Sequence, residues 1–200
     1  MLLDLKEGRE VSDKDFDQIF DPKTRKASQT HWSEIKTSQI AANFLADVEN
    51  ARVLDVGSGC GKFCFVGALT TKAHFTGIEM RKDLCVAART LAKDLKVERL
   101  SFVHANALEA DWSEFTSIYL FNPFYENLGE ISRIDSDIVP SKKKYLGDVG
   151  ATKQKLAQLA VGTRVATYHG YGDEMPASYF LQQANVDCIK GLDFWIKGEA

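Results

Sequence analysis

The stretch Val53-Leu54-Asp55-Val56-Gly57-Ser58-Gly59-Cys60-Gly61 joins an apolar run to three closely spaced glycines. The run from Ala51 to Val56 predicts a buried strand, and the residues from Lys62 to Leu69 predict the start of a helix. In such a strand-turn-helix the missing side chains let a ligand approach the backbone, and the helix N-terminus favours a negative group such as a carboxylate. The turn therefore predicts a site for a nucleoside or amino-acid cofactor.

Spacing separates this turn from two other glycine-rich turns. A dinucleotide-binding GxGxxG needs glycine at position 62, where the chain has Lys62. A phosphate-binding P-loop needs glycine at position 56 and serine or threonine after the lysine, where the chain has Val56 and Phe63. Both alternatives are excluded by these residues.

The remaining pattern is DxGxGxG, made by Asp55, Gly57, Gly59 and Gly61, and it resembles motif I of the class I S-adenosylmethionine-dependent methyltransferases. The resemblance implies S-adenosylmethionine as cofactor, bound by this turn with Ser58 included. It also implies that a carboxylate at the end of the next strand accepts the ribose hydroxyl protons. That residue is Glu79, the last of Thr76-Gly77-Ile78-Glu79.

The adenine end of the cofactor is expected near the third strand, which ends in Phe102-Val103-His104-Ala105-Asn106-Ala107. The family usually places an acidic or amide side chain here to meet the adenine amino group, which makes Asn106 the candidate. Ala107 would offer its backbone NH to the ring, and Met80 would flank it. A solvated loop asparagine and a packed methionine are the alternatives.

The fourth expected strand ends in Asn122-Pro123-Phe124-Tyr125, at the carboxyl edge where open α/β sheets bind ligands. This run resembles the Asn-Pro-Pro-Tyr motif of amino-directed methyltransferases, with Phe124 in place of the second proline. Methyl transfer needs an in-line nitrogen lone pair, which the Asn122 side chain and the Pro123 carbonyl can aim by accepting NH groups. The aromatic faces of Phe124 and Tyr125 can stabilise a cation. A strand-ending turn is the alternative, and in that case too Asn122 is expected to line the cofactor pocket.

Short β-rich runs alternate with amphipathic stretches from residue 51 onward, which predicts crossover units. The expected strands are 51–57, 73–79, 100–104, 116–121, 163–169, 185–190 and 192–197, and the expected helices are 61–70, 82–95, 142–160 and 176–184. The last two strands are too close for a crossover helix and predict an antiparallel hairpin. This layout resembles class I methyltransferases and implies an α/β, three-layer Rossmann-like sandwich, whose mostly parallel seven-stranded sheet is closed by that hairpin.

Residues 1–50 lack this alternation and are expected to form a helical appendage on a methyltransferase domain of residues 51–200. A helix is predicted over 34–48, capped by Ser33. His31 and Trp32 before it either cover the methionine end of the cofactor or anchor the appendage.

Composition places the chain among globular proteins, with 44% hydrophobic and 26% charged residues. A net charge of −3 and a pI near 5.8 disfavour a nucleic-acid partner. The N-terminus becomes charged too early for a signal peptide, and no apolar run of about 18 residues appears, so we expect a cytoplasmic protein without a membrane partner. The cysteine spacing predicts no metal site.

The sequence thus favours a methyltransferase acting on a nitrogen acceptor, with protein preferred over nucleic acid. The terminal hairpin and the Asn-Pro-Phe end look most like non-SET protein lysine methyltransferases. An RNA or DNA adenine methyltransferase, a small-molecule methyltransferase and a non-catalytic S-adenosylmethionine-binding regulator are the alternatives.

Overall fold

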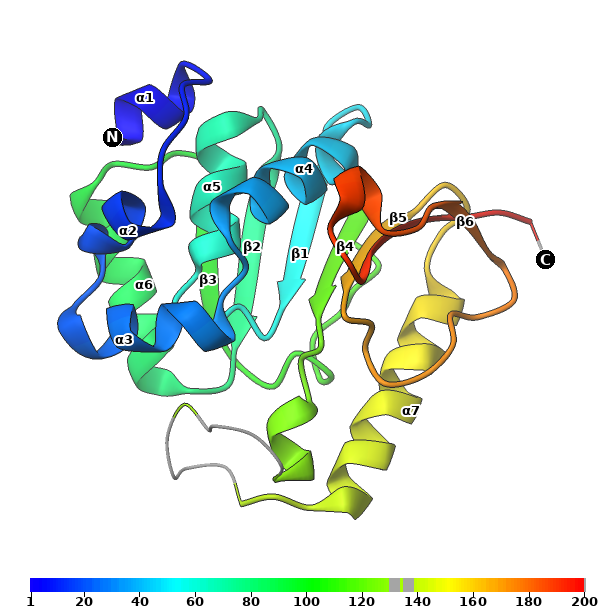
Figure 1. Ribbon diagram of the computed structural model, residues 1–200. Coiled ribbons are helices and arrows are strands. Elements are labelled where there is room, and N and C mark those ends of the chain that lie inside the picture. The colour runs from blue at the N-terminus through cyan, green and yellow to red at the C-terminus, as the bar shows by residue number, and fades with distance from the viewer. Residues whose placement is uncertain (130–133, 135–138, 200) are drawn as a thin grey trace.

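A computed structural model describes residues 1–129, 134 and 139–199, and its centre is a seven-stranded sheet (Figure 1). The strand order is β3-β2-β1-β4-β5-β7-β6. The strands are β1 (Arg52–Val56), β2 (His74–Glu79), β3 (Leu100–His104), β4 (Ser117–Phe121), β5 (Arg164–Tyr168), β6 (Tyr179–Gln183) and β7 (Leu192–Lys197). Strands β1 to β5 pair in parallel, whereas β7 is antiparallel to both β5 and β6. The predicted fold class is therefore confirmed.

Helices cover both faces of the sheet, because successive strand residues point to opposite sides. In β1, Val53 packs into the core beneath α4 (Ile35–Ala46) and α5 (Lys62–Thr70), which lie over β1 and β2 in Figure 1. Its neighbour Leu54 packs into the opposite core with α7 (Lys142–Gln158). The second predicted crossover helix, 82–95, is α6 (Lys82–Asp94), which contributes to the first core. The two cores lie between the sheet and these helices, which form the outer layers of the sandwich.

The C-terminal hairpin exists, but its first strand is not where the sequence predicts it. Residues 176–184, expected to be a helix, contain β6, which pairs with β7 through a register shift near Leu181. Residues 185–190, expected to be a strand, contain the 3-10 turn η3 (Val186–Cys188). Asn185 and Asp187 take left-handed backbone there, with φ of 47° and 49°. Both expectations were wrong. Residues 185–190 are not a strand because left-handed residues interrupt extended backbone. Residues 179–183 are not a helix because pairing with β7 imposes extended backbone on them.

The N-terminal residues form α1 (Leu2–Lys6), α2 (Asp13–Phe16), the 3-10 turn η1 (Asp17–Ile19) and α3 (Pro22–His31) before α4. Helix α3 was not predicted, although Asp21 caps it by accepting the NH groups of Lys23 and Thr24. The predicted cap of the next helix was wrong. The residue before α4 is Glu34, while the Ser33 hydroxyl hydrogen-bonds the Tyr119 hydroxyl at 2.6 Å.

The parallel strands end at one edge of the sheet, and their order reverses between β1 and β4. Ligands of open α/β sheets bind at such a switch point. The glycine turn follows β1, Glu79 ends β2, and Asn122 follows β4. Among the described residues, no helix is long and apolar enough to cross a membrane, and no group of three or more His, Cys, Asp or Glu is placed to bind a metal ion.

Candidate active site

The glycine turn is held in a conformation that favours glycine at three positions. Gly57, Gly59 and Gly61 have φ of 76°, 55° and 83°, in the left-handed region. The NH groups of Gly57 and Ser58 both donate to the Ile78 carbonyl, at 3.0 and 3.1 Å. The turn is therefore fastened to the end of β2.

Close packing explains why two of these glycines cannot carry a side chain. A Cβ at Gly59 would lie 2.2 Å from the Trp32 ring, and one at Gly61 would lie 2.3 Å from the Phe102 ring. The Trp32 indole nitrogen also donates to the Thr24 carbonyl at 3.3 Å. Trp32 thus lies on the turn and holds α3, as expected of a residue that anchors the N-terminal segment, and its contact with the methionine end of the cofactor stays a prediction.

Glu79 lies beside the turn with its carboxylate oriented by backbone donors. Its oxygens accept the NH of Gly59 at 2.9 Å and the NH of Arg81 at 2.7 Å. Burial raises the pKa of Glu79, which is 3% exposed, while the two backbone hydrogen bonds oppose that rise. A carboxylate oxygen has two lone pairs, so each can accept a ribose hydroxyl as well. Glu79 lines one cleft with Gly57, Gly59 and Asn122, and this geometry fits the cofactor.

Asp55 and Ser58 lie behind the turn, outside the residues that line the clefts described here. Asp55 is 4% exposed, and burial raises its pKa to about 7, although the Cys64 thiol donates to it at 3.3 Å. Ser58 is 7% exposed, and its hydroxyl packs against Gly77. Asp55, Ser58 and Gly61 therefore shape the turn, and direct cofactor contact by their side chains stays a prediction.

The raised pKa of Asp55 predicts a pH-dependent stability difference for Asp55→Asn. Between pH 4 and pH 7 the unfolded chain releases this proton and the folded chain retains it, so wild-type stability falls as pH rises. The substitution removes that loss. The variant's stability relative to wild type should increase by about 2 kcal/mol from pH 5 to pH 8. Urea unfolding at both pH values checks this, and an equal difference at both would contradict it.

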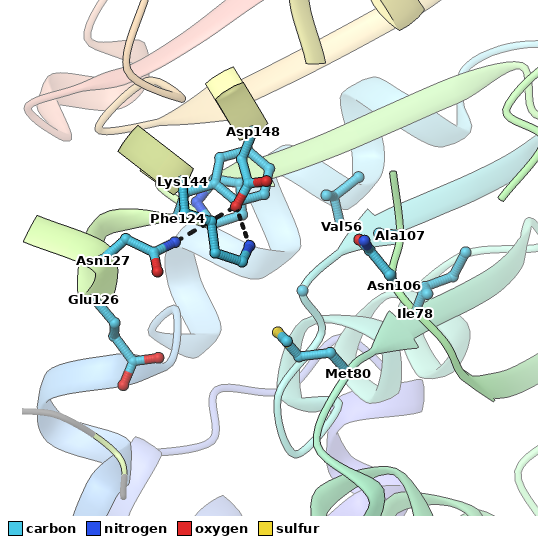
Figure 2. A pocket seen from close by; sticks show the side chains of 12 residues that line it. Val56, Ile78, Met80, Asn106, Ala107, Phe124, Glu126, Asn127, Lys144 and Asp148 are labelled. Atoms are coloured by element: carbon cyan, nitrogen blue, oxygen red, sulfur yellow. Dashed lines mark hydrogen bonds and ion pairs between the residues drawn. The ribbon is translucent and has the colours of Figure 1, made fainter. Parts of the chain in front are cut away.

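The predicted adenine-binding residues lie around a separate, largely apolar cavity (Figure 2). Met80, Asn106 and Ala107 line it, together with Val56 and Ile78. The Asn106 carboxamide is already engaged locally, because its oxygen accepts the Leu108 NH and its nitrogen donates to Glu109, both at 3.1 Å. Its contact with adenine therefore stays a prediction.

The Asn-Pro-Phe-Tyr run is divided between the cavity and the clefts. Asn122 has φ of 38°, uncommon for a residue with a side chain, and its NH donates to the Gly170 carbonyl at 3.0 Å. Phe124 lines the apolar cavity, whereas Asn122 and Tyr125 line the clefts on the other side. Pro123 packs against Gly57, because a Cβ placed on this glycine would lie 3.5 Å from the proline Cβ. The run thus lies between the apolar cavity and the two clefts.

A larger cleft of about 650 Å³ lies beside Asn122 and Tyr125. Its aromatic wall is a row of rings, with Phe121 4.7 Å from Tyr168 and Tyr168 4.3 Å from His169 between ring centroids. Three carboxylates and one lysine line the same cleft, namely Asp13, Asp17, Glu34 and Lys62. The cleft therefore combines aromatic faces with an excess of negative groups.

Two ion-pair groups around the site were not predicted from the sequence. The Lys62 ammonium, 2% exposed, contacts Asp13 at 2.6 Å, Asp17 at 2.8 Å and the Ser28 hydroxyl at 3.1 Å. Arg81, after β2, pairs with Glu126 at 2.6 Å in the 3-10 turn η2 (Tyr125–Leu128). The sequence shows which of these residues are charged but not which of them pair. In all but one of these contacts the two partners are 45 or more residues apart, so no local pattern could match them.

Comparisons with known proteins identify the family of this chain. The family model described as a methyltransferase domain matches residues 47–158. A release factor glutamine methyltransferase of Buchnera aphidicola subsp. Baizongia pistaciae (strain Bp) is 29% identical over 97 residues, which cover 48% of this chain and 35% of that protein. The match therefore spans about a third of that curated relative's length.

Two solved structures share the fold. An RNA methyltransferase from Salinibacter ruber, in complex with S-adenosyl-L-homocysteine, has a TM-score of 0.56 and 23% identity, covering 83% of this chain and 91% of that one. TrmN from Thermus thermophilus has a TM-score of 0.60 and 18% identity, covering 88% of this chain and 52% of that one. At these identities the likeness concerns the fold alone.

Proposed function

This chain belongs to the methyltransferase domain family, and on that premise we propose that it transfers a methyl group from S-adenosylmethionine to a nitrogen atom of a protein substrate. The prediction of a class I S-adenosylmethionine-dependent methyltransferase is confirmed at the level of the family and the fold. The acceptor is our inference, and a lysine side chain is the acceptor that we favour.

The observation that carries this proposal is the cleft beside Asn122 and Tyr125. Its rings at Phe121, Tyr168 and His169 offer faces on which a cationic or methylated nitrogen is favourable. The exposed carboxylate of Glu34 adds negative charge at the same cleft. This chemistry suits an amine on a flexible aliphatic chain.

The charges of this cleft favour protein over nucleic acid. A nucleic acid brings phosphates, which bind where lysine and arginine gather. Here three carboxylates face one ammonium group, and the chain carries a net charge of −3. The curated relative is named for a glutamine side chain of a release factor, which is also a nitrogen acceptor on a protein.

Each part of the site has a role in this proposal. When bound, S-adenosylmethionine supplies a methyl group on a sulfonium sulfur. The turn at Gly57 and Gly59 would accommodate the cofactor against the backbone, and Glu79 would accept its ribose hydroxyls. The Asn122 carboxamide oxygen and the Pro123 carbonyl would accept NH groups of the acceptor and orient its lone pair.

Two measurements test the proposal in sequence. Calorimetric titration should detect S-adenosylmethionine binding, and no binding at millimolar cofactor would refute it. The protein is then incubated with a cell extract and cofactor labelled in the methyl group, and the protein and RNA fractions are digested separately. Label should be recovered as methyl-lysine from protein. Label in RNA or small molecules would instead support those acceptors, and binding without transfer would support a regulator.

A further inference from the structure

Two of the clefts described above share one wall. The cleft that contains Glu79 and the cleft that contains the aromatic row are both lined by Thr30, His31, Trp32, Phe121, Asn122 and Tyr125. With the cofactor in the first cleft and the acceptor amine in the second, the methyl group passes between them at this shared wall. A group that acts on the acceptor nitrogen during the transfer is therefore expected in this wall.

A lysine acceptor needs a base, because its ammonium group has no free lone pair. With an unperturbed pKa near 10.4, fewer than about one lysine side chain in a thousand is neutral at pH 7. In the part of the chain that the structure describes, the shared wall has two titratable residues, His31 and Tyr125. A phenol keeps its proton at neutral pH, whereas an imidazole can accept one. His31 is therefore the candidate base.

The surroundings of His31 keep its imidazole available for a proton. Burial lowers the pKa of this half-buried histidine, so its ring is neutral at pH 7; Glu126 opposes this shift and Arg81 adds to it. Among residues 1–129, 134 and 139–199, no group is hydrogen-bonded to its ring nitrogens. The other ionisable groups of the two clefts are Glu79, Glu34, Tyr168, His169 and the Lys62 group with its two aspartates.

We propose that His31 is the general base of the reaction and takes the proton from the ammonium group of the acceptor lysine. This inference rests on the proposed function, since an amide acceptor carries no ammonium proton to remove. One ring nitrogen of His31 accepts the proton. The electron pair left on the lysine nitrogen then forms the bond to the methyl carbon as the bond from that carbon to sulfur breaks, and its electron pair stays on sulfur. The proton leaves His31 for water.

The position of His31 also favours the imidazolium that forms in this step. His31 is the last residue of α3, a helix of ten residues, and a helix C-terminus stabilises a cation. The Glu126 carboxylate adds negative charge to the same surroundings. Of the three clefts described above, His169 and Glu34 line only the one with the aromatic row, so they lie outside the shared wall.

The test measures the rate of methyl-lysine formation by the full chain at different pH values. The substrate is the protein fraction of a heat-treated cell extract, and the cofactor is labelled in its methyl group. The wild-type rate should change less than about threefold from pH 7.5 to pH 9.5, because His31 is neutral throughout. His31→Ala should be about 100-fold slower at pH 7.5, a usual contribution of a general base. Its rate should approach that of the wild type by pH 9.5, because the neutral fraction of lysine rises about tenfold per pH unit.

His169→Ala is the matched control, because it removes a histidine of the aromatic row that lies outside the shared wall. Its rate relative to the wild type should be the same at both pH values. His31→Gln, which lacks a basic nitrogen but keeps a polar side chain, should behave like His31→Ala. Circular dichroism at both pH values checks that each variant is folded.

Three results would overturn the inference. They are a loss in the His31 variants that is equal at both pH values, a wild-type rate in these variants at pH 7.5, and a loss in His169→Ala that disappears at pH 9.5. Calorimetry should find the S-adenosylhomocysteine affinity of His31→Ala within about tenfold of the wild type. A larger decrease would assign His31 to the methionine end of the cofactor instead. A wild type that forms no methyl-lysine would overturn the proposed function as well, so the two failures are distinguishable.

Discussion

Replacing Asn122 by alanine should lower the rate of methyl transfer about a thousandfold or more, while S-adenosylmethionine affinity stays within about tenfold of wild type. Asn122 lines both clefts at the carboxyl edge of the sheet, the one that contains Glu79 and the one that contains the aromatic row. Its carboxamide would hold the acceptor nitrogen in line with the methyl group, and a lost orienting contact lowers turnover more than binding. Single-turnover kinetics measures the rate of methyl transfer, and calorimetric titration measures the affinity for S-adenosylmethionine.

Backbone strain needs its own control in this experiment. Asn122 has φ of 38°, which alanine tolerates poorly and glycine adopts readily. Asn122→Gly should therefore lose turnover like Asn122→Ala, because both lack the carboxamide. Substantial turnover in the glycine variant would show that backbone shape, and not the side chain, is needed. Equal loss of affinity and turnover in both variants would place Asn122 in cofactor binding alone.

Replacing Lys62 by methionine should lower the free energy of unfolding by about 3–5 kcal/mol. Methionine fills the space of the lysine stem but leaves Asp17, which is 6% exposed, as a buried carboxylate without its cation. The same ammonium also contacts Asp13 and Ser28, so the change loosens α2, η1 and α3 together. Urea denaturation at neutral pH measures the loss.

Two further variants show whether the loss comes from the buried charge. The double change Lys62→Met with Asp17→Asn should recover much of the stability, because no unpaired carboxylate remains. Lys153→Met breaks an ion pair with Asp173 in which both side chains are about 40% exposed, and it should cost less than about 1 kcal/mol. Equal losses for the Lys62 and Lys153 variants would contradict this account.

Much of the fold could be predicted because its strands and helices have local signals. The glycine turn, β1 to β5 and α5 to α7 follow from apolar runs and helical spacing, and the structure places them within a few residues of the predicted bounds. The last strands could not be placed in this way. Strand β6 is at the sheet edge, where Phe180 and Leu181 are both exposed. Its sequence therefore lacks the alternation of apolar and polar residues that would predict a strand.

The predicted site residues lie together at one edge of the sheet, and strand topology explains why. Parallel strands bring their carboxyl ends together, so Gly57, Glu79, Asn106 and Asn122 had to converge once their strands were recognised. The contact between Asn127 and Asp148 could not be predicted from the sequence. It forms only because α7 packs on η2.

The glycine turn and the residues that follow each strand were therefore determined by the sequence alone, because backbone conformation and strand order depend on short, regular patterns. Only the tertiary structure decided the pairing of Lys62 with Asp17, the placement of Trp32 on Gly59 and the orientation of Asn127 by Asp148. These contacts join residues from different elements. Which side chains meet there depends on how helices pack on the sheet, and no local pattern specifies that.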